Sequence, residues 1–205
     1  MSIILGLDVS TSVTGVCVVD SAIAPDEKGS HIIVLDAIEF KKCKTLWDKA
    51  DVVSKYMSDM VRGSFDDRSR MPLCPDRIVL EEALMSFRPG MSSAQTISTL
   101  LRFNGIVSFI GRNIFKCEPE YIGSAHARKL CGIKLLRTGI AGPQKEQVFK
   151  HMAEHDLKHV VWPVKKSGKI VDSSRDSCDA YVIARAASVN GPVLPQIKKP
   201  KKKKI

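Results

Sequence analysis

The sequence predicts an α/β domain in which a mixed sheet, an antiparallel meander plus parallel strands, is flanked by helices. Three segments rich in β-branched and apolar residues follow one another within the first 40 residues. Short apolar strands then alternate with segments of helical spacing, which is the pattern of parallel strands covered by helices. A chain of 205 residues that is 44% hydrophobic suits one domain with a substantial core. We expect residues 1–192 to form that domain.

The first half of the chain contains the expected meander. The first apolar run ends in an acidic residue, and a polar turn separates it from a second apolar run. Pro25 and Gly29 mark the loop between the second run and the third. Apolar residues at helical spacing come next. The expected elements are strands over 2–8, 13–19 and 32–40, a loop over 21–30, a helix over 46–60 and a polar loop over 63–70.

The second half alternates strands with helices. A short buried strand runs directly into Glu81-Glu82, and the last helix follows a polar loop in which Ser173 or Ser174 would act as its cap. The expected elements are strands over 77–80 and 121–123, helices over 94–114, 124–130 and 145–155, a loop over 163–173, and the final helix.

The net charge of +10 is concentrated at the carboxyl end. Six lysines lie within 198–204, and without them the charge falls to +4. A Lys/Pro run cannot bury apolar surface, so we expect residues 193–205 to form a disordered tail. The tail is either a solvated end, a salt-sensitive contact to phosphate backbones, or a nuclear targeting signal if the host cell has a nucleus.

The six cysteines are scattered singly, without CxxC pairs or a matching His spacing. This argues against a zinc site and against a secreted disulfide framework. No apolar stretch is long enough to span a bilayer, and no basic region precedes the first strand as in a signal peptide. We therefore expect an intracellular, soluble protein, cytoplasmic or nuclear.

Four carboxylates fall where the predicted fold would bring them together. Asp8 ends the first strand and Glu81 ends the fourth, while Asp176 and Asp179 open the last helix on one face. Acids in a first helical turn are also favoured by the helix dipole alone, so the helical pair by itself is ambiguous. If the first and fourth strands are neighbours, however, both strand acids lie at one edge of the sheet, beside the start of the helix.

Four converging carboxylates would repel one another unless cations neutralise them. Hard oxygen ligands of this kind suit Mg²⁺, with Mn²⁺ as a substitute. Two such ions about 3.5–4 Å apart can activate a water and stabilise the leaving oxygen at a phosphodiester. The sequence therefore predicts a phosphodiester hydrolase with two metal ions held by Asp8, Glu81, Asp176 and Asp179.

Several segments also resemble RuvC-type Holliday junction resolvases, within the RNase H-like nuclease superfamily. The opening 3–15 resembles the first acidic strand of that family, Val79-Leu80-Glu81-Glu82 the second, and 176–184 its closing acidic helix. The segment 102–107 resembles the middle helix with its glycine, and 142–148 the loop and helix that carry a DNA-contacting lysine. The resemblance spans residues 3–188 in the family's order, and it favours Glu81 over Glu82 as the ligand.

The resemblance implies an RNase H-like fold and a homodimer that makes paired, symmetric cuts in a four-way DNA junction. It implies that Lys145 contacts the phosphate or the transition state, and that Lys129 or Arg128 contacts DNA. Each of these residues could instead be an ordinary exposed cation. Where the family has an aromatic wedge this chain has Leu84, so Phe87 could supply the wedge beside Arg88, or it could belong to the core.

Two other functions are compatible with the sequence. An RNase H-like nuclease that acts on other branched DNA or on RNA would carry the same four acids. A junction-binding protein without catalysis would carry them without using them. The glycine-containing opening also resembles the phosphate loop of actin-like ATPases, but those proteins need a second half for which this chain has no room.

Overall fold

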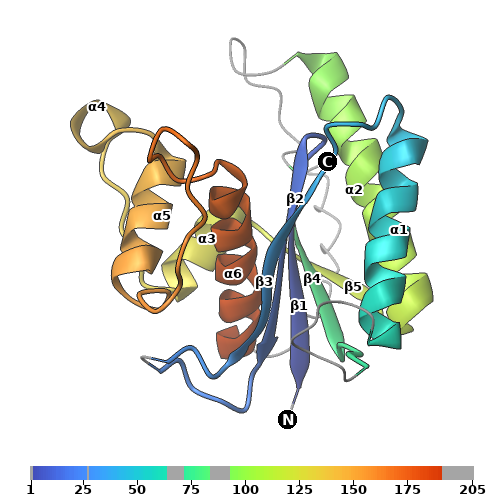
Figure 1. The fold of residues 1–205 in the computed structure, drawn as a ribbon, viewed down its shortest axis with the longest axis horizontal. Helices are drawn as coiled ribbons and strands as arrows, with labels where there is room; N and C mark the ends of the chain where they lie inside the picture. Colours follow the sequence, from blue (N-terminus) through green and yellow to red (C-terminus); the bar gives the residue numbers. More distant parts are fainter. Residues whose placement is uncertain (1, 27, 64–71, 84–92, 191–205) are drawn as a thin grey trace, which may run out of the picture.

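The sheet of this protein runs in the order β3-β2-β1-β4-β5 (Figure 1). The computed structural model describes residues 2–26, 28–63, 72–83 and 93–190, and all statements about the structure concern these residues. The strands are β1 (Ile3–Val9), β2 (Val13–Asp20), β3 (Ile32–Glu39), β4 (Arg77–Glu81) and β5 (Pro119–Ile122). The predicted mixed sheet, with a meander followed by parallel strands, is confirmed.

The register of β1 decides where the strand acids lie. β1 pairs antiparallel with β2, which places Asp8 opposite Gly15. On its other side β1 pairs parallel with β4, and their register ends at the pair Leu7 and Leu80. Asp8 in β1 and Glu81 in β4 each come one residue after this last pair. The two acids therefore leave neighbouring strands at the same edge of the sheet.

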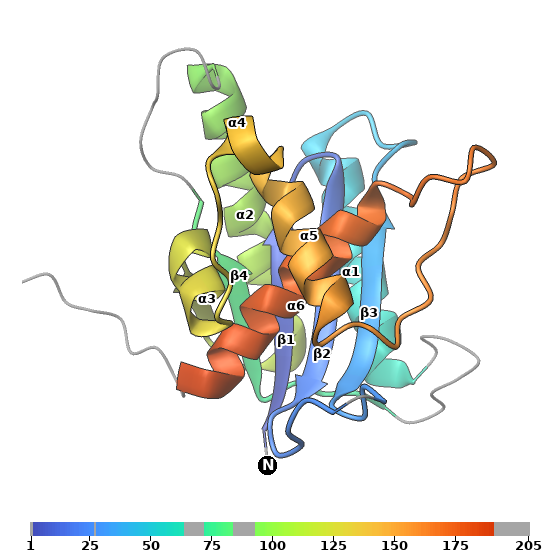
Figure 2. The same cartoon turned by 90° about the vertical axis from the view of Figure 1, so that its left-hand side faces the viewer.

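Helices cover both faces of the sheet, with α1 and α2 on one side and α3, α5 and α6 on the other (Figures 1 and 2). The first of them begins with a capping box between Thr45 and Asp48, and Gly63, in the left-handed conformation, caps its carboxyl end. The helices are α1 (Leu46–Arg62), α2 (Ala94–Phe115), α3 (Ser124–Leu130), α4 (Thr138–Ala141), α5 (Gln144–Glu154) and α6 (Ser173–Asn190).

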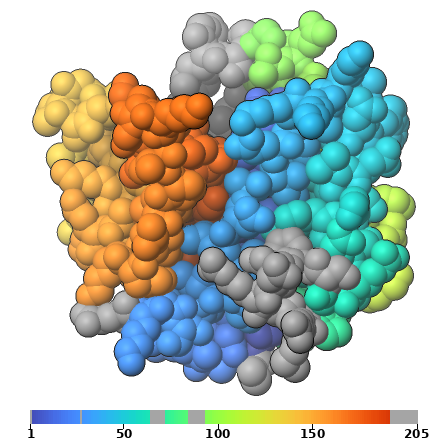
Figure 3. Space-filling view, in the orientation of Figure 1, coloured from blue at the N-terminus to red at the C-terminus, as the bar shows by residue number. Residues whose placement is uncertain are grey.

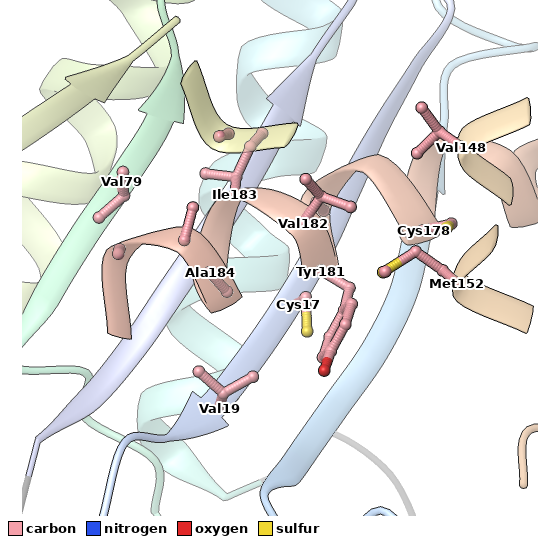
Figure 4. Close-up of a cluster of buried hydrophobic side chains, with 14 of the residues drawn as sticks. Cys17, Val19, Val79, Val148, Met152, Cys178, Tyr181, Val182, Ile183 and Ala184 are labelled. Atoms are coloured by element: carbon pink, nitrogen blue, oxygen red, sulfur yellow. The ribbon is translucent and has the colours of Figure 1, made fainter. Parts of the chain in front are cut away.

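Each face of the sheet has its own apolar core. On one side Leu5 and Leu7 of β1 pack against residues of α1 and α2 such as Met57 and Phe103. On the other side Ile4 belongs to a cluster formed with α5 and α6. Figure 4 shows side chains of β2, β4, α5 and α6 meeting in this second layer. The alternation along β1 follows the period of two expected for a strand buried on both faces.

Two glycines allow α6 to lie directly on the sheet. A Cβ atom built on Gly15 would lie 1.9 Å from the backbone oxygen of Asp176, and one on Gly6 would lie 2.5 Å from that of Ala180. Any side chain at either position would push the helix away from β1 and β2. A strand glycine often marks such a close approach of another backbone.

The structure differs from the expected elements in several places, and many element ends shift by one or two residues. β5 begins at Pro119, two residues before the predicted start, and the four-residue helix α4 was not predicted. The expected serine cap of α6 was wrong: Ser173 and Ser174 are both helical, and the buried Ser174 hydroxyl has no hydrogen-bond partner. In the described ranges, no helix has the length and apolar character required to cross a membrane.

We predict that Gly15→Ala destabilises the protein by about 1–3 kcal/mol or more, the usual cost of forcing extra atoms into a packed site. Gly105 is a matched control, because it lies inside α2 and, apart from the neighbouring backbone of that helix, no atom lies within 4 Å of its built Cβ. Gly105→Ala should therefore stabilise the protein by about 0.5–1 kcal/mol. Urea denaturation measures both free energies of unfolding. Equal effects of the two substitutions would contradict the close approach of α6.

Candidate active site

Three carboxylates converge at the edge of the sheet where β1 ends. Asp8 comes from β1, and Asp176 and Asp179 come from the first two turns of α6. Their side chains are only 13%, 14% and 14% exposed, respectively. Glu81 lies close enough for its charge to act on both Asp8 and Asp179, and it lines a cavity of about 270 Å³ together with Asp8 and Asp176.

Lys145 places its ammonium group among these carboxylates. Its Nζ donates to Asp176 Oδ1 at 2.5 Å and lies 3.5 Å from Asp179 Oδ2 and 3.9 Å from Asp8 Oδ2. The Lys145 side chain is 43% exposed, so it lies partly at the surface of the site. A single cation thus bridges the strand acid and both helix acids.

The packing of α5 against α6 sets the position of Lys145. Val148, Phe149 and Met152 bury the inner face of α5. Arg175, directly before Asp176 in the sequence, makes an ion pair with Glu146 and lies 5.5 Å from the centre of the Phe149 ring. These contacts join the first turn of α5 to the first turn of α6, so Lys145 and Asp176 are held by the same junction.

Burial and the repulsion between like charges make it costly for the carboxyl groups of the site to ionise. Burial, followed by the charges of Asp179 and Glu81, raises the pKa of Asp8 well above its usual range. Burial also raises the pKa of Asp179 to about 6, against the lowering effect of Lys145 and Arg128. Burial alone would lower the pKa of Lys145, but its hydrogen bond to Asp176 and the nearby acids raise it overall.

The donor set fits a divalent cation. Four carboxylates supply the hard oxygen atoms that Mg²⁺ and Mn²⁺ prefer, and one ammonium group does not balance their charge. Within the described residues no three His, Cys, Asp or Glu side chains are already grouped tightly enough to hold a metal ion. Lys145 lies where the carboxylates would otherwise meet. Binding of a metal would therefore require its ammonium group to move away from Asp176.

Asn104 is a residue of the site that the sequence did not single out for a role. It is 6% exposed on the inner face of α2, where its Nδ2 donates to the backbone oxygen of Glu81 at 3.2 Å. The register of β1 and β4 ends one residue earlier, so this amide stabilises the end of β4 and the backbone of Glu81. A polar residue between the apolar residues that face the core was the one signal available in the sequence.

The remaining predicted residues fall into three groups. Arg128 and Lys129 lie on α3 and line a hollow of about 380 Å³ together with Gln144, next to Lys145 in the sequence. Phe87 and Arg88, like Leu84 and the lysine tail, lie outside the described residues. Cys178 is fully buried, and burial raises the pKa of its thiol, which agrees with a packing role between the two helix acids.

A mixed sheet in the order β3-β2-β1-β4-β5, covered by helices on both faces, is the arrangement of the RNase H-like fold. Neither a protein-family model nor a curated protein sequence matches the chain. Among solved structures, the chain is similar to Thermus thermophilus RuvC in complex with a Holliday junction substrate. The identity is 13%, the match covers 92% of this chain and 94% of that chain, and the TM-score is 0.58.

A second structure of Thermus thermophilus RuvC is 16% identical, with 91% and 93% of the two chains covered and a TM-score of 0.52. Both likenesses extend over nearly the whole length of each chain. The predicted RNase H-like fold, in the form found in RuvC resolvases, is thereby confirmed.

We predict that Asp179→Asn stabilises the metal-free protein at pH 8. Because the pKa of Asp179 is raised to about 6, its ionised form is disfavoured in the folded state, and this cost is present above pH 6 and relieved as the pH falls through that value. A gain of about 1 kcal/mol would raise Tm by about 2–4 °C in a domain of this size. Thermal unfolding in EDTA at pH 8 and at pH 5 measures the gain, which should be smaller at pH 5.

Asp172→Asn is the matched control on the same helix boundary. The Asp172 side chain is 80% exposed, and its hydrogen bond to Lys165 lowers the pKa of its carboxyl. Its replacement should not raise Tm at either pH. A lower Tm for Asp179→Asn than for the wild type at pH 8 would contradict the cost assigned to that carboxylate.

Proposed function

We propose that this protein is a metal-dependent endonuclease that resolves four-way DNA junctions by paired phosphodiester hydrolysis on symmetric strands. The observation that carries the proposal is the convergence of Asp8, Asp176 and Asp179 beside Glu81, at the end of β1. These residues form a buried anionic site that opens into a small cavity at the surface. Such a site suits a reaction in which cations bring a phosphate to carboxylates.

The four carboxylates would hold two metal ions, either Mg²⁺ or Mn²⁺. When bound, the ions supply an activated water and neutralise the charge that develops on the phosphate oxygens. The carboxylates would orient the ions, and the burial of these side chains excludes bulk water from the site. Lys145 carries a positive charge on a half-exposed side chain, so after release from Asp176 it can contact a phosphate oxygen at the cavity mouth.

The surface beside the site favours a nucleic acid as substrate. Arg128 and Lys129 line the hollow next to the amino end of α5, and the charge of Arg128 reaches Asp179. Cations at this place can hold the phosphates that flank the scissile bond. The similar Thermus thermophilus RuvC was solved with a Holliday junction substrate, which supports a branched DNA as the specific partner.

A four-way junction has approximate two-fold symmetry, and paired cuts need two active sites related by that symmetry. We therefore include a homodimer in the proposal. One chain carries one set of the four acids, so the second cut requires a second copy.

We predict that Asp8→Asn and Glu81→Gln lower the rate of junction cleavage by a factor on the order of 10³ or more, since several kcal/mol of metal-ion stabilisation are lost. Asp172→Asn should cleave at the wild-type rate, because this exposed acid faces Lys165. The assay uses a four-way junction labelled in turn on each strand, with and without Mg²⁺. Binding of the junction should survive in both inactive variants.

The same assay separates the proposal from its alternatives. Equal cleavage of four-way junctions, flaps and structured RNA would favour a general RNase H-like nuclease. Tight junction binding without cleavage, together with no calorimetric signal for Mg²⁺, would favour a non-catalytic junction-binding protein. Symmetric paired nicks that depend on Mg²⁺ are the outcome that the proposal requires.

We also predict that Mg²⁺ and Mn²⁺ raise the Tm of the wild-type protein at pH 8 and lose this effect below about pH 6. Metal ligands must be deprotonated, and the pKa of Asp179 is raised to about 6, so protonation removes a ligand in that range. KCl at matched ionic strength is the control for salt. An equal metal shift in Asp8→Asn would contradict binding at this site.

A further inference from the structure

The segment 134–142, here called the α4 loop, presents apolar side chains to solvent. It connects α3 to α5 and contains the short helix α4. Leu136 is 60% exposed and Ile140 is 76% exposed, although both are aliphatic. Lys134 and Arg137 are exposed beside them. Two large aliphatic side chains exposed within one loop of nine residues offer a partner an apolar contact surface.

Hydrogen bonds hold the α4 loop in a fixed shape. The Gln147 side chain accepts from the backbone N–H of Leu136 at 2.8 Å through Oε1. Its Nε2 donates to the backbone oxygen of Leu136 at 3.2 Å and to that of Gly142 at 2.9 Å. One side chain of α5 therefore clamps both ends of the loop. The apolar tip is presented in a preformed geometry, which lowers the entropic cost of binding.

The charge of the surrounding segment identifies the kind of partner. None of the 25 residues between Glu120 and Glu146 is acidic, and five are lysine or arginine. Three of these cations, Arg128, Lys129 and Lys134, line the hollow of about 380 Å³ at the base of the loop, together with Leu135. An apolar tip on a uniformly basic segment is complementary to DNA, which offers phosphates and the faces of bases.

The α4 loop lies at the same end of the molecule as the carboxylates. Figures 1 and 2 both show α4 at the end where α5 and α6 begin. Lys145 lies in the first turn of α5, and Asp176 and Asp179 lie in the first two turns of α6. In the space-filling view this part of the chain forms the upper left corner of the surface (Figure 3). A DNA molecule with a phosphate at the carboxylates can therefore extend to the loop.

We propose that the α4 loop is a second DNA-contacting element, in which Leu136 and Ile140 pack against unstacked bases at the branch point of the DNA. The inference rests on the proposed function, because it assumes that DNA binds at the carboxylate site. Lys134 and Arg137 contact the backbone phosphates on either side of the tip. The loop thus contributes selectivity for branched over linear DNA.

The physical reason lies in what each substrate exposes. Linear duplex and branched DNA carry the same phosphates, so the cations of the α4 loop bind both. Only at a branch point do bases lose a stacking neighbour and expose an apolar face. Aliphatic side chains that enter such steps are known from proteins that bend DNA. Contact through Leu136 and Ile140 therefore adds affinity for the branched substrate alone.

The test compares the full-length variant Leu136→Ser/Ile140→Ser with the wild type in EDTA. Fluorescence anisotropy measures Kd for an immobile four-way junction and for a linear duplex with the sequence of one arm. We expect junction affinity to fall about tenfold, roughly the loss of one buried aliphatic contact, with duplex affinity nearly unchanged. A fluorescent base analogue at the branch point should brighten on binding the wild type and not the double variant.

Two controls accompany this measurement. Val161→Ser/Val164→Ser removes two other exposed aliphatic side chains, 94% and 63% exposed, and should leave both affinities unchanged. Arg137→Gln removes a phosphate contact, so it should weaken junction and duplex equally and reduce the salt dependence of both. If the serine pair lowers Tm, the milder pair Leu136→Ala/Ile140→Ala replaces it, with the same expected direction.

Several results would overturn the inference. One is an unchanged ratio of junction to duplex affinity in the double variant, and another is an equal loss of affinity for both substrates. A third is a change of the double variant from dimer to monomer, which would assign the tip to a protein interface. The proposed function fails separately. If the wild type neither prefers nor cleaves junctions, the nuclease proposal is wrong; if it does both and the double variant does so equally, only the role of the α4 loop is wrong.

Discussion

The contact between α6 and the strands β1 and β2 is the constraint on which the rest of the structure depends. Gly15 lies opposite Asp8 in the sheet and directly beneath the backbone of Asp176 in the helix. Because Gly15 has no side chain, α6 can lie close enough to the sheet for the acid of β1 to approach the two acids of α6. Gly6 extends the same close approach further along α6. The packing that closes one apolar core also assembles the carboxylates, so the fold and the site share one origin.

The assembled carboxylates store unfavourable electrostatic energy, which Lys145 only partly offsets. Three ion contacts reach its ammonium group, yet burial and repulsion still raise the pKa of Asp8 and Asp179. A site with excess buried negative charge favours any cation that neutralises it better than one ammonium group. Since the packing of α5 on α6 fixes the backbone of Lys145, its flexible side chain is the part that can yield to such a cation.

The sequence predicted the parts of the structure that depend on local patterns. Strands, long helices and the four acids follow from periodicity and from acids at strand and helix ends. The roles of Asn104 and Gln147 did not follow, because their partners are backbone atoms 23 and 11 positions away. Helix α4 is too short for periodicity to reveal. Gly6 and Gly15 were visible as strand glycines, but only the packed helix shows what they permit.

Helix α5 links the chemistry of the site to the surface beside it. Lys145 and Gln147 are two residues apart, so their side chains leave the helix on different sides. Lys145 contacts the acids, while Gln147 clamps the α4 loop. Because both residues stand on one helical turn, the loop and the carboxylates keep a fixed spacing. Their side chains nevertheless make separate contacts, so the loop can change in length and polarity while the acids keep their geometry. In the proposed function, the loop would then set substrate choice and the carboxylates would carry out hydrolysis.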